Sequence, residues 1–291
     1  MKKLVLLIWL SVHLIAGCTS QQDDSNLEKQ YTFVENISYK SDYFQDEYEE
    51  ERCKLDLYLP NEKKNFPVMV WFHGGSLKRG SKDDKMTRSV GMKFANEGIA
   101  VAVVNYRLSP KAKYPAYIND AAAAVAWVFK NISGYGGNPN SVFIAGHSAG
   151  GYQVYMLALN PEFLKKYDVE SINIAGVIPV AGQTFTHYTV REERGIEKSE
   201  KTPVIDDASP CFLANKNTPP MLIIWADGDT YARIEENKSL INLLNKEGNN
   251  NIYSKEILER THWSLIRKIP KKDDPLAKEI IDFISKYHQL K

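Results

Sequence analysis

The segment at residues 146–151 (Gly-His-Ser-Ala-Gly-Gly) holds a serine between glycines, after an apolar run and before a helix-like stretch. This G-x-S-x-G pattern is typical of a nucleophile elbow, a sharp turn that exposes the serine hydroxyl and leaves no space for bulky neighbours. The positive end of the following helix favours negative charge that develops beside the serine. The pattern therefore predicts nucleophilic catalysis by Ser148.

A second glycine-rich motif, at residues 73–76 (His-Gly-Gly-Ser), follows the apolar run at 67–72. With the segments at 105–110 (Asn-Tyr-Arg-Leu-Ser-Pro) and 135–139 (Tyr-Gly-Gly-Asn-Pro), it makes the chain resemble the α/β-hydrolase family from about residue 54 onward. The resemblance is to its hormone-sensitive-lipase-like and carboxylesterase-like (BD-FAE-like) branches. It implies an oxyanion hole built from the main-chain N–H groups of Gly75, Ser76 and Ala149. Ser76 replaces a frequent glycine, which keeps the donor but narrows the space beside it.

A serine nucleophile needs a histidine base that is oriented by a carboxylate, and in this fold the chain order is serine, acid, histidine. Only His262 and His288 follow the strand after which the acid is expected. His288 lies in the terminal helix, where we expect a solvated side chain. We therefore predict His262 as the base and read His73 as part of the glycine-rich loop.

The acid is expected after the apolar run at 221–225, where the sequence continues Ala-Asp-Gly-Asp. Both Asp227 and Asp229 fit this position on residue type alone. The family pattern H-G-x-x-D, aligned with residues 225–229, favours Asp229, and Asp227 is then expected to start the turn.

Strand-like and helix-like segments alternate along the chain, which predicts an α/β fold with a mainly parallel sheet of eight strands and helices on both faces. The expected strands are residues 31–39, 54–59, 67–72, 99–105, 141–145, 174–180, 221–225 and 252–258. The expected helices are residues 81–96, 119–131, 150–159, 234–247 and 275–287. Parallel sheets bind ligands at the carboxyl ends of their strands, where all the candidate residues lie.

The catalytic domain is predicted to cover residues 31–291. Within it, residues 183–220 form a long, charged and proline-containing stretch between two expected strands. An insertion of that length in a compact domain is often functional, so we expect a short cap over the site.

The first 17 residues have a basic start and a short apolar core that is typical of a signal peptide. They end in Ile-Ala-Gly before Cys18, which resembles the lipobox of bacterial lipoproteins. The resemblance implies lipidation of Cys18, a flexible tether over residues 18–30 and a location in the bacterial cell envelope, in the periplasm or at the outer-membrane surface. A disulfide between Cys53 and Cys211 stays open at this point.

Composition narrows the function further. A formal net charge of +1 gives no electrostatic reason to expect nucleic acid as a partner. The sequence has neither zinc-ligand spacing nor a phosphate-binding loop, so we expect no metal and no cofactor. The best prediction is a serine hydrolase for carboxylic esters with short-chain or carbohydrate-linked acyl groups. The alternatives are an arylformamidase with the same triad and a catalytically silent binding protein, while the oligomeric state stays open.

Overall fold

The computed structural model describes residues 31–40, 44–61, 63–196 and 203–288. The predicted signal peptide, Cys18 and the tether lie outside these ranges. The described chain forms one sheet of eight strands in the order β1-β2-β4-β3-β5-β6-β7-β8. The strands are β1 (Tyr31–Ser38), β2 (Lys54–Pro60), β3 (Phe66–Phe72), β4 (Ala100–Val104), β5 (Gly137–His147), β6 (Gly176–Val180), β7 (Met221–Gly228) and β8 (Ile252–Thr261).

Six neighbouring strands, from β4 through β3 to β8, run parallel, while β1 and β2 add an antiparallel edge. The prediction of a mainly parallel eight-stranded α/β sheet is confirmed. In β3, Val68, Val70 and Phe72 enter one hydrophobic core, and Met69 and Trp71 enter the other. A strand buried on both faces needs this uninterrupted apolar run, which is the pattern visible in the sequence.

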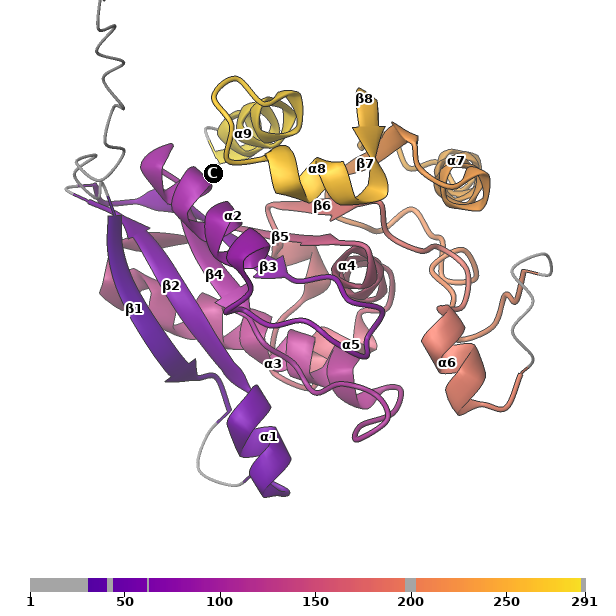
Figure 1. Cartoon of the computed structure of the whole chain (residues 1–291), viewed down its shortest axis with the longest axis horizontal. Coiled ribbons are helices and arrows are strands. Elements are labelled where there is room, and N and C mark those ends of the chain that lie inside the picture. Colours follow the sequence, from indigo (N-terminus) through magenta and orange to yellow (C-terminus); the bar gives the residue numbers. More distant parts are fainter. Residues whose placement is uncertain (1–30, 41–43, 62, 197–202, 289–291) are drawn as a thin grey trace, which may run out of the picture.

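Helices cover both faces of the sheet, as predicted. They are α1 (Glu47–Arg52), α2 (Lys85–Asn96), α3 (Ala116–Asn131), α4 (Ala149–Leu159), α5 (Glu162–Lys165), α6 (Tyr188–Glu193), α7 (Tyr231–Lys246), α8 (His262–Lys268) and α9 (Pro275–His288). Helices α2, α8 and α9 supply one core and α3, α4 and α7 the other, and Figure 1 shows α3 across the sheet from α2, α8 and α9.

Several helix boundaries differ from the expected ones. Helix α2 begins at Lys85 rather than at residue 81, because Asp84 accepts a hydrogen bond from the main-chain N–H of Ser81 and holds residues 81–84 in a turn. Helix α7 begins three residues early, since the Thr230 side chain caps it. The short helices α1, α5, α6 and α8 were not predicted, because four to seven residues carry too little periodicity.

Among the described residues, no helix combines the length and the apolar character needed to cross a bilayer.

Candidate active site

Ser148 lies in a strained turn between β5 and α4. Its backbone has φ 57° and ψ −115°, a conformation that residues with a side chain rarely adopt. A Cβ at Gly146 would lie 2.6 Å from the carbonyl carbon of Gly150, and one at Gly150 would lie 2.0 Å from the carbonyl oxygen of Phe72. The two glycines are therefore required by close packing, and the turn leaves Ser148 partly exposed at the carboxyl edge of the sheet.

The loop after β3 lies against this serine. A Cβ placed on Gly74 would come 3.4 Å from the Cβ of Ser148. Gly75 has φ 117°, and a side chain there would meet the carbonyl oxygen of Arg79 at 2.1 Å. Ser76 keeps the same left-handed region with φ 63°. The loop is thus a tight turn whose shape depends on positive φ angles at successive residues.

The predicted oxyanion donors are free of protein acceptors. Within the described ranges, the main-chain N–H groups of Gly75 and Ser76 donate no hydrogen bond. Ala149 is the first residue of α4, where an N–H has no partner inside the helix. Among the described residues, the main-chain donors of Gly75, Ser76 and Ala149 are thus unused, and Gly75 and Ser76 directly follow the residue that lies against Ser148. Unused donors of this kind are what an oxyanion hole would need.

Asp229 and His262 come from the ends of the neighbouring parallel strands β7 and β8. The Nδ1 atom of His262 lies 2.8 Å from Oδ2 of Asp229, and the other carboxylate oxygen accepts the N–H of Thr230 at 2.7 Å. The Asp229 side chain is 2% exposed and the His262 side chain is 20% exposed. A buried carboxylate that holds Nδ1–H in place leaves Nε2 as the nitrogen able to accept a proton.

His147 brings this pair to the elbow. Its Nε2 lies 2.9 Å from the carbonyl oxygen of His262, and the two rings stand 4.6 Å apart between centroids. Burial, followed by the charge of His262, holds the pKa of His147 well below its ordinary value, so the ring stays neutral and donates to that carbonyl. In the described part of the chain, no hydrogen bond joins the Ser148 hydroxyl to His262. Such contacts often tighten only when substrate binds.

Asp227 has a different role from Asp229. Its exposed carboxylate accepts the N–H groups of Glu259 and Arg260, each at 3.0 Å. These two hydrogen bonds lower the pKa of Asp227 and tie β7 to the end of β8 just before His262. The two acids that the sequence left as alternatives therefore differ in position, and only Asp229 contacts the imidazole.

His73 is a structural residue of the loop. Burial lowers its pKa to about 3, and its Nδ1 lies 2.7 Å from the carbonyl oxygen of Gly74. Its ring stacks on Tyr106 at 4.3 Å, and the Tyr106 hydroxyl donates to the His73 carbonyl oxygen at 2.7 Å. His288, expected to be solvated, is partly exposed, and its Nδ1 lies 2.8 Å from the hydroxyl of Ser141 in β5.

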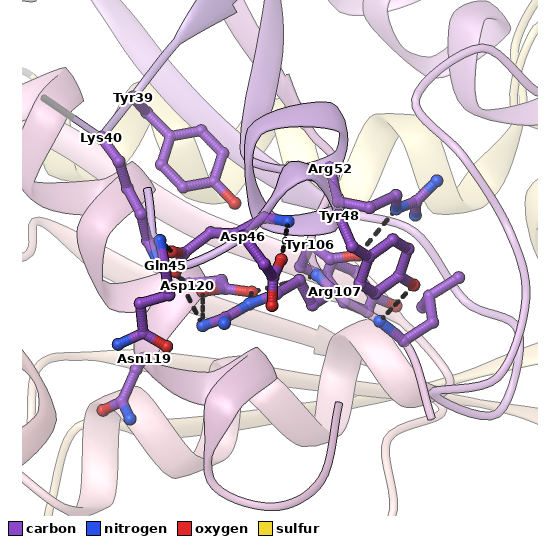
Figure 2. A network of polar contacts seen from close by, with 12 residues as sticks. Tyr39, Lys40, Gln45, Asp46, Tyr48, Arg52, Tyr106, Arg107, Asn119 and Asp120 are labelled. Atoms are coloured by element: carbon purple, nitrogen blue, oxygen red, sulfur yellow. Dashed lines mark hydrogen bonds and ion pairs between the residues drawn. The ribbon is translucent and has the colours of Figure 1, made fainter. Parts of the chain in front are cut away.

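A buried network of charges supports Tyr106 from below. Asp120 of α3 accepts three hydrogen bonds from Arg107, one main-chain and two from the guanidinium, and Glu49 of α1 pairs with the same guanidinium. Lys40 contacts both carboxylates (Figure 2). The network holds the segment 105–110 in place. Through the contact of Tyr106 with His73, this segment in turn holds the loop at residues 73–76, which we call the oxyanion loop after its predicted role.

The same network contains the one close group of potential metal ligands found among the described residues, Glu49, Cys53 and Asp120. Lys40 and Arg107 already neutralise both carboxylates, so the group is explained by its ion pairs.

Cys53 and Cys211 are both buried free thiols, so the open disulfide is not formed. Burial raises the pKa of the Cys53 thiol to about 12 and that of Cys211 to about 11.

The insertion at residues 183–220 touches the site directly. The Thr189 hydroxyl in α6 donates to the carbonyl oxygen of Ser76 at 2.6 Å, and the Tyr152 hydroxyl in α4 donates to the carbonyl oxygen of Ala208 at 2.8 Å. Sequence reasoning missed Thr189 and Tyr152, because no motif marks either residue and the contacts join segments far apart in the chain.

A cavity of about 170 Å³ borders the glycine-rich loop at residues 73–76, and Ser148 and His262 are not among the residues that line it. Its walls include Gly75, Met86, His147 and Trp263. Trp263, which directly follows the candidate base, is half exposed there. The cavity thus offers aromatic and aliphatic contacts beside Gly75, the one predicted oxyanion donor among its lining residues.

Comparisons with known proteins agree with this geometry. Residues 55–244, more than half of the chain, match the family model described as BD-FAE. Carboxylesterase 1F of Mus musculus is 35% identical over 148 residues, which cover 47% of this chain and 26% of that protein. The probable carboxylic ester hydrolase LipM of Mycobacterium tuberculosis is 27% identical over 193 residues, which cover 61% and 44%. The chain thus spans less than half the length of these relatives.

Solved structures show the same fold. A truncated form of a carbohydrate esterase from gut microbiota superposes with a TM-score of 0.74 at 22% identity, over 90% of this chain and 98% of that one. Esterase B from Lactobacillus rhamnosis superposes with a TM-score of 0.70 at 17% identity, over 90% and 87%. Together with the match of the family model, the α/β-hydrolase fold shows that this chain belongs to the BD-FAE family.

Proposed function

We propose that this protein is a serine hydrolase that cleaves carboxylic esters through Ser148, His262 and Asp229. The observation that carries the proposal is the 2.8 Å contact of Asp229 with His262, made beside the strained Ser148 turn. The family match and the ester-hydrolase relatives support the reaction class.

In this mechanism, Nε2 of His262 takes the proton of the Ser148 hydroxyl while its oxygen attacks the ester carbonyl. The carbonyl oxygen becomes an oxyanion, which the N–H groups of Gly75, Ser76 and Ala149 stabilise. One such donor lowers the barrier by about 3 kcal/mol. His262 then protonates the leaving alcohol, and a water molecule, deprotonated by the same imidazole, releases the acid from Ser148. Asp229 holds the tautomer and stabilises the imidazolium.

The substrate class we propose is an ester with a short-chain or carbohydrate-linked acyl group. The likeness in fold to a carbohydrate esterase from gut microbiota supports the carbohydrate part. The cavity of about 170 Å³ beside the oxyanion loop fits a small acyl or aryl group better than a long chain.

The test is hydrolysis of 4-nitrophenyl acetate, acetylated xylan, a feruloylated sugar and N-formylkynurenine by the wild type and by Ser148→Ala. The proposal predicts ester turnover that falls by more than about a thousandfold in the variant. Ser89→Ala, which removes a hydroxyl that donates to the Lys85 carbonyl oxygen within α2, is the matched control and should keep ester turnover. Turnover of N-formylkynurenine alone would instead indicate an arylformamidase, and no turnover of any substrate would indicate a silent binding protein.

We also propose that the protein is anchored in the cell envelope through a lipid on Cys18. The lipobox-like sequence before Cys18 supports this location. The anchor would hold the catalytic domain near a membrane surface without spanning it.

A further inference from the structure

Arg233 is partly exposed, but one nitrogen of its guanidinium is buried and has no partner among the described residues. Arg233 lies in the first turn of α7, four residues after Asp229. Its NH1 nitrogen is buried and has no hydrogen bond, and no described residue forms an ion pair with its guanidinium. Burying a charged donor without an acceptor costs free energy, so an unsatisfied nitrogen of this kind calls for an explanation.

Helices α7 and α4 contact each other through Asn237 and Tyr155, and Arg233 and Ser148 both lie on the side of this contact nearer the carboxyl edge of the sheet. Both helices start at the carboxyl edge of the sheet, after β7 and β5. The Tyr155 hydroxyl in α4 donates to Oδ1 of Asn237 in α7 at 2.6 Å. Arg233 lies one turn before Asn237 on the same helix face, and Ser148 lies two turns before Tyr155. Relative to the Tyr155–Asn237 contact, Arg233 in α7 and Ser148 before α4 are therefore both displaced toward the carboxyl edge of the sheet.

Electrostatic effects agree with this placement. Burial is the main cause of the lowered pKa of His187 in the insertion, and the positive charge of Arg233 lowers that pKa further. Arg233 has the same effect on His147, after burial and His262. Its charge thus acts both on the residue before Ser148 and on the insertion that touches the site.

The nearby carboxylates are engaged elsewhere. Asp229 accepts from His262 and Thr230, as described above. Glu236, one turn along α7, accepts the main-chain N–H of Thr184 with Oε2 at 3.2 Å. Neither carboxylate comes within ion-pair distance of Arg233 in the described structure, although the negative charges of both act on it. The buried NH1 nitrogen therefore keeps a donor that a group from outside the chain could use.

We propose that Arg233 binds a carboxylate carried by the acyl or the alcohol part of the substrate, and that it selects esters with a negative charge. A planar guanidinium matches a carboxylate with two parallel hydrogen bonds, and an anion offsets the buried positive charge better than a neutral hydroxyl does. This inference rests on the proposed ester hydrolysis at Ser148.

The experiment compares two pairs of esters that differ only in charge. 4-Acetoxybenzoate and its methyl ester carry the difference on the alcohol side. The 4-nitrophenyl ester of hydrogen adipate and that of methyl adipate carry it on the acyl side. In at least one pair, the wild type should prefer the anion. Arg233→Gln should lower kcat/KM for that anion by about tenfold or more, the effect of one lost charge-assisted hydrogen bond. Its kcat/KM for the neutral ester should stay within about threefold.

Two further variants sharpen the comparison. Arg233→Lys keeps the charge without the planar fork and should retain part of the preference. Lys238→Gln removes an exposed positive charge from the same helix and should leave the preference unchanged. If Arg233→Gln changes the anionic and neutral esters alike in both pairs, Arg233 does not select charge, although ester hydrolysis stands. If the wild type cleaves none of the four esters and a fluorophosphonate leaves Ser148 unlabelled, the proposed function fails as well.

Discussion

At the scale of single residues, the structure separates side chains that the sequence left equivalent. Asp227 and Asp229 both follow an apolar strand, and residue type alone favours neither. The main-chain path decides, because it turns Asp229 under the His262 ring and leaves Asp227 exposed against the N–H groups of Glu259 and Arg260. The place of Ser148 in a turn between strand and helix, and that of His262 after the last strand, could be predicted, since motif and chain order indicate them. Arg233 carries no sequence signal, because its position depends on the packing of α7 against α4.

The two aspartates should respond differently to the same substitution. Asp229→Asn should lower kcat for an aryl ester by about ten-thousandfold, because an amide no longer stabilises the imidazolium and favours the wrong tautomer. Asp227→Asn should lose no more than about tenfold, since its hydrogen bonds only shape the loop before His262. Steady-state kinetics of both purified variants check this. A larger loss of kcat in Asp227→Asn than in Asp229→Asn would contradict the assignment of Asp229 as the acid.

At the scale of secondary-structure elements, a hydrogen bond links the insertion at 183–220 to the oxyanion loop. Thr189 is fully buried and links α6 to the Ser76 carbonyl. The sequence predicted an insertion here but not this contact, because hydrophobic periodicity shows where elements lie and not what their polar side chains touch. The inner strands β3, β4, β6 and β7 were predicted well, since their apolar runs are nearly uninterrupted. Helix α8 was missed because it starts at His262 directly after β8, with no intervening loop.

One isosteric substitution, Thr189→Val, removes this hydrogen bond. Thr189→Val leaves the Ser76 carbonyl without its partner, so the loop should shift and kcat/KM for an aryl ester should fall about tenfold. Thr218→Val is the control. Thr218 lies just before β7, at the opposite edge of the sheet, and its buried hydroxyl accepts a hydrogen bond from the Asn249 side chain. That control should lower the midpoint of thermal unfolding while keeping kcat/KM. Equal kinetic effects of the two variants would argue against a specific role for Thr189.

At the scale of the whole molecule, stability should depend on three buried neutral histidines. Burial lowers the pKa of His73 to about 3 and the pKa values of His147 and His187 well below their ordinary value. The folded protein therefore keeps these rings neutral while the unfolded chain takes up protons below about pH 6.5. Their stabilising contribution is complete above that pH and is lost as the pH falls.

Urea unfolding at pH 7.5 and at pH 5.0 checks this sign. Each buried histidine should reduce the free energy of unfolding by about 2 kcal/mol at pH 5.0 relative to pH 7.5. His73→Asn should remove about a third of the difference. Equal free energies of unfolding at the two pH values would mean that these rings are protonated in the folded state.

The proposed anchor is a property of the full-length chain in its cell. Detergent phase partition of the chain expressed in a bacterial host should place the wild type in the detergent phase. Cys18→Ser should move to the aqueous phase, because a lipid attached at the cysteine supplies the membrane affinity. Identical partition of both proteins would contradict lipidation at Cys18.

The central claim is that Ser148 is a nucleophile activated by His262 and Asp229. Peptide mapping by mass spectrometry after reaction with a fluorophosphonate tests it most directly, since the reagent forms a covalent bond only with an activated hydroxyl. The proposed mechanism predicts one modified peptide, labelled on Ser148, and labelling slowed by at least a hundredfold in His262→Ala. A folded protein that hydrolyses esters but carries the label elsewhere, or is labelled equally fast without His262, would contradict it.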